Sequence, residues 1–371
     1  MLLHGIFPPL TTPFYPDGRL YLKKLEHNVD HYSKTPISGL VLLGSTGEAI
    51  MLSDEERREV LKTAREACAP QKVLIAGTGA ESALETLRLT EYAAQLGYDV
   101  ALVRTPHFYR PQMEPANLLA FYRTVADRSP IPIMIYSVPV FTKYDMPPEL
   151  VIELAEHANI IGIKESGGDA EKIRRMVEGT RHIKRTATVT ETFAAATPRM
   201  LKAAESRSNN GNGGELVPVG VLTSDKEAAD QQPEMGRRAA GSSSSSITKT
   251  GNLKTRNKEV GFQVLAGTAH KFLPSLEAGA VGGVLAFAVP APTACYEIYT
   301  AWKEGDQELA RIKQERITGA STRVGSQLGI PGLKYALDLN GYYGGPARLP
   351  FLPLTAEAKA EVERLMADVR N

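Results

Sequence analysis

Residues 160–169 read IIGIKESGGD, and residues 170–178 follow directly as AEKIRRMVE. The first stretch opens with a short β-branched apolar run that is typical of a buried strand. The second has apolar residues three to four positions apart, which is typical of an amphipathic helix. A strand that is apolar throughout, without alternation, suits a parallel sheet covered on both faces. The stretch therefore predicts one strand–helix unit of an α/β protein.

The same unit recurs along the chain, because eight apolar runs are each followed by a segment with helical spacing. Eight consecutive units favour a closed TIM (β/α)₈ barrel over a doubly wound open sheet. We expect this barrel within residues 1–304 and a C-terminal helical extension over residues 305–371. The predicted strands lie in residues 5–13, 39–44, 73–77, 99–103, 131–138, 160–166, 262–267 and 281–287.

One segment, residues 205–260, breaks this pattern between the sixth helix and the seventh strand. It is rich in Ser, Asn, Gly, Gln and charge, as in SNNGNGGE at 208–215. Such a composition cannot bury enough apolar surface to offset the entropy lost on ordering, so we expect a disordered insertion. A tolerated surface insertion is favoured over a regulatory segment, for which there is no motif. We expect it at the barrel face opposite the active site.

The composition excludes several classes of protein. The chain has 371 residues, 43% of them hydrophobic and 23% charged, and a net charge of +1, so nothing favours a nucleic-acid or membrane partner. Cys68 and Cys295 are far apart, which argues against a disulfide framework or structural zinc. No run approaches the ~18 apolar residues of a membrane span, and the N-terminus has no signal or transit pattern. We expect a cytoplasmic protein.

Lys164 interrupts the sixth apolar run. Strand alternation places it on one face with Gly162 and Ser166, and Glu165 on the other. In a TIM barrel the active site lies at the carboxyl ends of the strands, so Lys164 belongs to the top interior layer, with Gly162 leaving space beneath. Removal from water favours the neutral amine, which is a nucleophile toward carbonyls. For this lysine alone, a salt bridge at the strand end is an equal alternative.

Two further groups end neighbouring strands. Tyr136 follows IPIMI, and its hydroxyl could shuttle a proton, although tyrosines often cap buried strands. The turn GSTGE, residues 44–48, offers the hydroxyls of Ser45 and Thr46 to a carboxylate. The sequence has no P-loop and no complete dinucleotide-binding fingerprint. The segment AGAVGG near the last strand lies where some barrels bind phosphate, so a phosphorylated substrate is an open alternative. The seven histidines show no ligand spacing, so we predict no metal.

The combination of GSTGE, YSVP at 136–139 and IGIKES at 161–166 resembles the dihydrodipicolinate synthase and N-acetylneuraminate lyase superfamily. These are class I (Schiff-base) aldolase barrels that act on pyruvate. The resemblance covers residues 5–178 and 262–364. It is closest to 4-hydroxy-2-oxoglutarate aldolase, especially in GIPGLKYALDLNGYYGGPARLP at 329–350. It implies a small 2-oxo acid substrate, no cofactor, and a homo-oligomer, a tetramer in this family.

The resemblance also implies roles for single residues. Lys164 is the expected Schiff-base lysine and Tyr136 the proton-shuttling tyrosine. Ser45 and Thr46 are expected to bind the carboxylate of the 2-oxo acid, and Ser166 to contact the substrate as well.

Two positions depart from the family pattern. Phe141 stands where the synthase has an arginine for a second carboxylate, and Phe108 stands where the synthase and lyase have a relay tyrosine. The adjacent Tyr109 is a candidate replacement in substrate binding.

We therefore expect cleavage of 4-hydroxy-2-oxoglutarate to pyruvate and glyoxylate. The alternatives are cleavage of a 2-keto-3-deoxy sugar acid, a synthase-like condensation on pyruvate, and a barrel that binds pyruvate without turnover.

Overall fold

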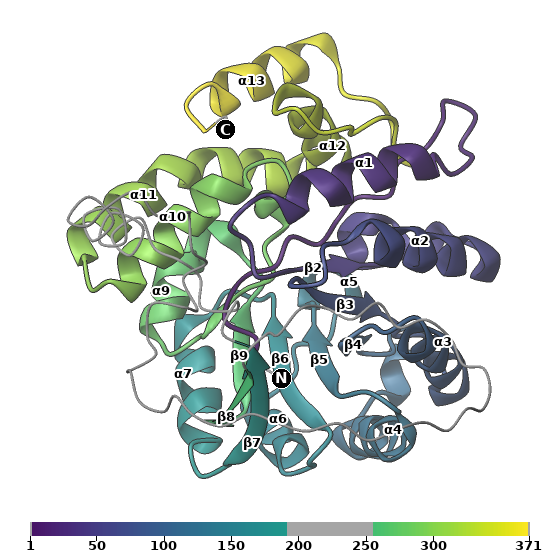
Figure 1. Cartoon of the computed structure of the whole chain (residues 1–371), viewed down its shortest axis with the longest axis vertical. Helices are drawn as coiled ribbons and strands as arrows, with labels where there is room; N and C mark the ends of the chain where they lie inside the picture. The colour runs from purple at the N-terminus through teal and green to yellow at the C-terminus, as the bar shows by residue number, and fades with distance from the viewer. Residues whose placement is uncertain (1, 191–254, 370–371) are drawn as a thin grey trace, which may run out of the picture. The chain divides into compact units, whose positions relative to one another are not determined.

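The computed structural model describes residues 2–190 and 255–369 (Figure 1). The chain divides into two units, of which the first comprises residues 1–187 and 257–371. The first unit holds the predicted strand–helix repeats.

Eight parallel strands of the first unit form one sheet in the order β1-β10-β9-β6-β5-β4-β3-β2. The chain just after β1 closes the sheet on β2, because Val41 N donates to the Pro8 carbonyl at 3.0 Å and Leu10 N donates to the Val41 carbonyl at 2.9 Å. The predicted TIM barrel is thereby confirmed. Its strands are β1 (Gly5–Ile6), β2 (Gly39–Leu42), β3 (Val73–Gly77), β4 (Val100–Arg104), β5 (Ile133–Ser137), β6 (Ile160–Glu165), β9 (Gln263–Ala266) and β10 (Gly282–Gly283).

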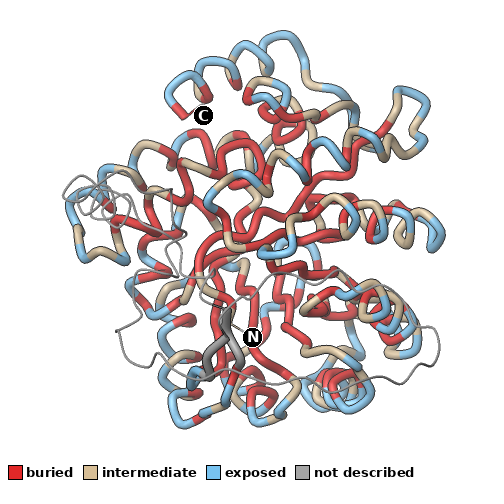
Figure 2. Tube along the Cα trace, viewed as in Figure 1, coloured by how far each residue is buried: buried red, intermediate tan, exposed pale blue. Residues whose placement is uncertain are grey.

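Helices surround these strands, and the strands themselves are almost wholly buried (Figure 2). Ser53 shows why a helix starts where it does: its hydroxyl accepts from Glu56 N while Glu56 bonds back to Ser53 N, a capping box that begins α2. The helices of the barrel are α1 (Leu22–Ser33), α2 (Asp54–Ala67), α3 (Ala83–Gln95), α4 (Pro115–Arg128), the short α5 (Pro139–Thr142), α6 (Pro148–Ala155), α7 (Ala170–Gly179), α9 (Phe272–Glu277) and α10 (Pro292–Lys303).

Alternation along the strands separates two layers. Val103, Ile135 and Ile163 face outward and join a core shared with the surrounding helices. The intervening residues face the barrel interior, and register aligns Arg104, Tyr136, Lys164 and Leu265 of four adjacent strands in one row. Parallel strands in register point such residues to the same side. The row lies at the carboxyl ends of the strands, where the sequence predicted the site.

The predicted C-terminal extension consists of α11 (Gln307–Ala320), a π-helical turn η8 (Ser321–Gln327), α12 (Gly329–Leu339) and α13 (Ala356–Met366). Figure 1 shows α12 beside α1. Asn28 of α1 joins the two regions, since its Nδ2 donates to the Tyr343 carbonyl at 2.8 Å and its Oδ1 accepts from Tyr343 N at 2.8 Å. The extension is therefore bonded to the N-terminal part of the barrel.

The predicted disordered insertion, residues 205–260, lies outside the described residues up to residue 254. Its last part was predicted wrongly, because residues 255–260 form β8 (Thr255–Val260), which pairs with β7 (Arg185–Thr190) in a two-stranded sheet. Neither strand follows from the apolar patterns, since TRNKEV and RTATVT are polar. In the part of the chain that the structure describes, no helix is long and apolar enough to cross a membrane.

Gly162 has a different role from the one expected. A Cβ at this position would lie 2.3 Å from the Gln263 carbonyl oxygen, so glycine serves the close approach of β6 to β9 and does not leave open space beneath Lys164.

We predict that Gly162→Ala lowers the free energy of unfolding by about 1–3 kcal/mol, because the new methyl group must push two central strands apart. Gly319→Ala in α11 is the matched control, since a Cβ added there would meet no neighbouring atom within 4 Å. There alanine should be neutral or stabilising by up to about 1 kcal/mol. Urea unfolding of both variants checks this, and equal midpoints would contradict it.

Candidate active site

Lys164 ends the inward face of β6 with only 4% of its surface exposed. Its Nζ lies 4.0 Å from the ring centroid of Tyr136, which β5 presents at the registered position. A lysine ammonium over a tyrosine face is attracted by the quadrupole of the ring. The two residues expected to carry the chemistry are thus in contact.

Three lysines are buried among the described residues, and their surroundings differ. Lys334 lies 2.6 Å from Glu48, and Lys172 contacts Asp145. For Lys164, the described part of the chain offers no carboxylate within ion-pair distance. The salt-bridge alternative for Lys164 therefore has no partner there. The Lys164 amine instead lies against the Tyr136 ring.

Ser45 contacts the hydroxyl group of Tyr136. Its Oγ lies 3.2 Å from the Tyr136 hydroxyl, at hydrogen-bond distance. Ser45 and the buried Thr46 belong to a short 3₁₀ turn, η1 (Ser45–Gly47), and Thr12 Oγ1 donates to the Gly47 carbonyl at 2.6 Å. A proton can pass between the two hydroxyls in this geometry.

The turn is held in an unusual backbone conformation. Leu43 and Glu48, which flank it, have φ of 58° and 55°, in the left-handed region that residues with side chains seldom adopt. Such conformations persist where the surroundings over-determine them, and they concentrate at functional sites.

Glu48 is the residue that anchors this turn. Its carboxylate is fully buried against Lys334 Nζ and accepts from Arg348 N at 2.8 Å. Lys334 also donates to the carbonyls of Thr12, at 2.9 Å, and Pro346, at 2.7 Å. Burial lowers the pKa of Lys334 below its ordinary value, while the charge of Glu48 acts in the opposite direction.

The sequence stretches that hold Glu48 and Lys334 carried the family resemblance, yet neither residue was predicted as part of the site. No local pattern joins two residues so far apart in the chain.

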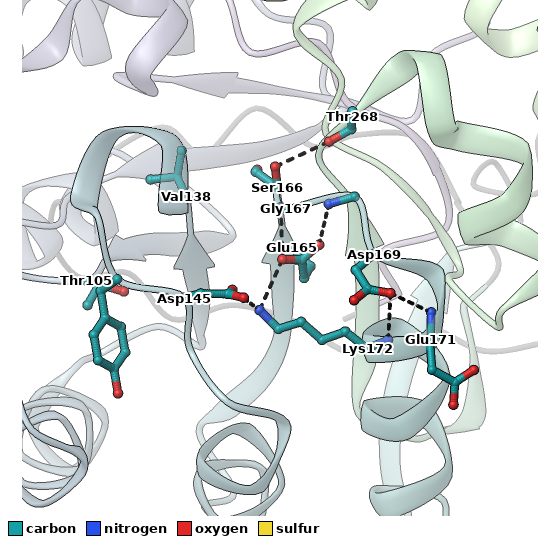
Figure 3. A network of polar contacts seen from close by, with 12 residues as sticks. Thr105, Val138, Asp145, Glu165, Ser166, Gly167, Asp169, Glu171, Lys172 and Thr268 are labelled. Carbon is teal, nitrogen blue, oxygen red and sulfur yellow. Dashed lines mark hydrogen bonds and ion pairs between the residues drawn. The ribbon is translucent and has the colours of Figure 1, made fainter.

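Ser166 lies beyond Lys164, where its Oγ is buried without a hydrogen-bond partner among the described residues. Its backbone is fixed, since Ser166 N donates to the Ser137 carbonyl at 3.0 Å and Thr268 Oγ1 donates to the Ser166 carbonyl at 3.3 Å (Figure 3). Gly267 makes room for the hydroxyl, because a Cβ there would lie 2.0 Å from Ser166 Oγ. A free hydroxyl in a fixed place suits substrate binding.

Glu165 fixes the loop after Lys164 from the opposite face, as the alternation predicted. Its two carboxylate oxygens accept from Gly167 N and Gly168 N, each at 2.9 Å, and one of them lies 3.4 Å from Lys172 Nζ. Lys172 of α7 also contacts Asp145, so the loop, the helix and the chain after β5 are joined (Figure 3).

The structure does not bring Tyr109 to this group. Tyr109 and Phe108 are 66% and 74% exposed, and their rings meet edge to face at 5.1 Å. Phe141 is also exposed, at 61%. None of the three lines the cavity described next, so the predicted contact of Tyr109 with substrate stays a prediction.

A cavity of about 290 Å³ opens beside Tyr136. Its walls include Ser45, Glu81, Arg104 and His107. Glu81 Oε2 accepts from the backbone N–H groups of His107 and Phe108 at 2.8 and 2.9 Å. Burial alone would raise the pKa of Glu81, but these N–H groups and the charges of His107 and Arg104 outweigh it and lower the pKa. Arg104 and Glu81 were not predicted from the sequence, because no motif contains them.

No group of three or more His, Cys, Asp or Glu side chains that could hold a metal ion occurs in residues 2–190 and 255–369.

Most of the chain is similar to known proteins. Residues 2–193 and 242–369 match the model of the Dihydrodipicolinate synthetase family. The chain is 29% identical over 370 residues to a 4-hydroxy-tetrahydrodipicolinate synthase of Methanothrix thermoacetophila, covering 100% of this chain and 98% of the relative. It is 39% identical over 179 residues to the enzyme of that name from Methanosarcina mazei, covering 48% of this chain and 60% of the relative.

Solved structures share the fold. YagE, a prophage protein of the dihydrodipicolinic acid synthase family from E. coli K12 crystallised with pyruvate, superposes with a TM-score of 0.72 at 24% identity. The alignment covers 100% of this chain and 99% of YagE.

We predict that Glu48→Gln and Lys334→Met each lower the free energy of unfolding by about 3–5 kcal/mol, because each leaves one buried charge unpaired. The double variant should recover most of this loss. Asp30→Asn and Lys34→Met at an exposed ion pair are the matched control. Each should lower the free energy of unfolding by no more than about 1 kcal/mol. A double-mutant cycle by urea unfolding measures both couplings, and a buried coupling no larger than the surface one would refute the anchoring role.

Proposed function

Because the chain belongs to the dihydrodipicolinate synthetase family, whose members are lyases and synthases of the class I aldolase type, we propose that it cleaves 4-hydroxy-2-oxoglutarate to pyruvate and glyoxylate. The observation that carries this proposal is the buried Lys164 amine, which lies against Tyr136 with no carboxylate beside it in the described residues.

Binding places the reacting carbon. The C1 carboxylate of the substrate lies on the turn of Ser45 and Thr46, and the C2 carbonyl faces Lys164 Nζ. Ser166, with its buried free hydroxyl directly after β6, donates to the substrate. A fixed orientation of this kind converts the attack of the amine into an effectively intramolecular step.

The chemistry then proceeds through a covalent intermediate. The Lys164 amine adds to C2, and loss of water gives a protonated imine. Tyr136, with Ser45 at its hydroxyl, takes the proton of the C4 hydroxyl as the C3–C4 bond breaks and its electron pair moves to the iminium nitrogen. Glyoxylate leaves, the enamine takes the proton back at C3, and hydrolysis of the resulting imine releases pyruvate and the free lysine.

A condensation on pyruvate is the second candidate, since the two relatives from Methanothrix and Methanosarcina carry the synthase name. Its product has seven carbons, so pyruvate would add to a four-carbon amino aldehyde that bears a carboxylate. This chain departs from the synthase pattern at Phe141, where the synthase has an arginine. A 2-keto-3-deoxy sugar acid is a third candidate substrate.

We expect sodium borohydride with pyruvate to leave a stable adduct on the peptide that contains Lys164, because the reduced imine cannot hydrolyse. Lys164→Met should give no adduct. Tyr136→Phe should retain it while lowering kcat by about 10²- to 10⁴-fold, the usual contribution of general acid–base catalysis. Peptide mass spectrometry decides the matter: an active enzyme with no adduct, or with the adduct elsewhere, would exclude this mechanism.

Substrate choice has a separate test. We expect pyruvate release from 4-hydroxy-2-oxoglutarate to exceed that from 2-keto-3-deoxyhexonates and sialic acid in a coupled assay. Consumption of pyruvate with the four-carbon amino aldehyde, without cleavage of 4-hydroxy-2-oxoglutarate, would establish the synthase instead. Trapped pyruvate with neither reaction would indicate a barrel without turnover.

A further inference from the structure

We propose that Arg104 binds the second carboxylate of the substrate, so that the site selects dicarboxylic 2-oxo acids. This inference rests on the proposed function for the position of C1 and C2. It assigns a specificity-determining role to a residue that stands on β4, outside the motifs of the sequence.

The position of Arg104 in the barrel is the first support. Register places its Cα opposite that of Tyr136, and Tyr136 opposite Lys164. All three side chains therefore start toward the interior at the same level. Adjacent strands are ~4.8 Å apart, so Arg104 starts roughly 10 Å from Lys164, with Tyr136 between them.

The donors of Arg104 are the second support. A guanidinium has five N–H donors. Arg104 uses Nη2 in an ion pair with Glu81 Oε1 at 2.8 Å, whereas its Nε is buried and has no hydrogen-bond partner among the described residues. An unsatisfied buried donor on a charged group is costly. A carboxylate in the adjoining cavity would remove that cost.

The other charged groups of the cavity have partners already. Arg57 lies 3.5 Å from Asp54 and donates to the Ala49 carbonyl. Glu81 Oε2 is occupied by the two backbone N–H groups of the loop after β4. Glu81 thus holds Arg104 in place with one oxygen and leaves the guanidinium able to accept a second carboxylate.

The cavity gives the path from Lys164 to Arg104. Ser45, Tyr136 and Arg104 all line it, and Lys164, which does not line it, lies with its Nζ 4.0 Å from the centroid of the Tyr136 ring. A substrate chain attached to Lys164 passes the hydroxyl edge of Tyr136, where C4 must lie for cleavage, and then enters the cavity. Its terminal C5 carboxylate then meets Arg104. In this way Arg104 supplies the cation that Phe141 lacks.

Binding without cleavage tests the inference independently of turnover. The probes are 2-oxoglutarate, which has the second carboxylate, and 2-oxopentanoate, which has the same chain length without it. Each competes with pyruvate for borohydride trapping in the full-length wild-type protein, in Arg104→Gln and in Arg104→Lys.

We expect the wild type to bind 2-oxoglutarate more tightly than 2-oxopentanoate. Arg104→Gln should weaken the binding of 2-oxoglutarate by about 10- to 100-fold, because a charge-assisted hydrogen bond is lost. It should change the binding of 2-oxopentanoate by no more than about twofold. Arg104→Lys keeps the charge but not the forked set of N–H donors. Its affinity for 2-oxoglutarate should therefore lie between those of the wild type and of Arg104→Gln. Because each variant is judged by the ratio of two competitors, a partly unfolded preparation does not change the result.

An equal loss for both competitors, or no preference in the wild type, would overturn the role of Arg104. Trapping of pyruvate together with the expected ratios, but without cleavage of 4-hydroxy-2-oxoglutarate, would overturn the proposed function and support the carboxylate site. The two proposals therefore fail separately.

Discussion

The candidate site depends on one buried ion pair, Glu48 with Lys334. Both side chains are almost completely withdrawn from water, at 0% and 1% exposure, so each charge requires the other. The pair fixes the end of the turn that presents Ser45, and Ser45 in turn contacts Tyr136. A turn with left-handed residues on both sides would otherwise relax. The C-terminal extension thus helps to hold the turn that presents Ser45, although the expected catalytic residues all belong to the barrel.

The three buried lysines show how surroundings assign a role to one residue type. Lys334 and Lys172 have carboxylates within reach and join segments of the fold. Lys164 has an aromatic ring beside its amine instead, and this is the arrangement that the proposed function uses. The two buried carboxylates Glu165 and Glu48 have a similar role, since each accepts from one or more backbone N–H groups and lies within ion-pair distance of a buried lysine.

Much of this could be predicted from the sequence, because the relevant signals are local. The alternation of IIGIKES places Lys164 inside and Glu165 outside, and eight repeated units predict the barrel and the end at which the site lies. Arg104 could not be found in this way, since a charged residue that ends an apolar run also fits a solvated strand end. The partnership of Glu48 with Lys334 depends on tertiary packing between distant segments. Strand β8 was missed for a further reason, because its polar residues carry no apolar pattern.

The anchor at Lys334 also has a consequence for the synthesis of the protein. Chains are made from the N-terminus, and domains begin to fold as they emerge. The ribosome has already produced Ser45, Tyr136 and Lys164 long before it reaches the residue that locks their geometry. A chain that ends before Lys334 would leave the buried carboxylate of Glu48 without its ion-pair partner. The turn that presents Ser45 would therefore be anchored only after a segment made later than all the expected catalytic residues.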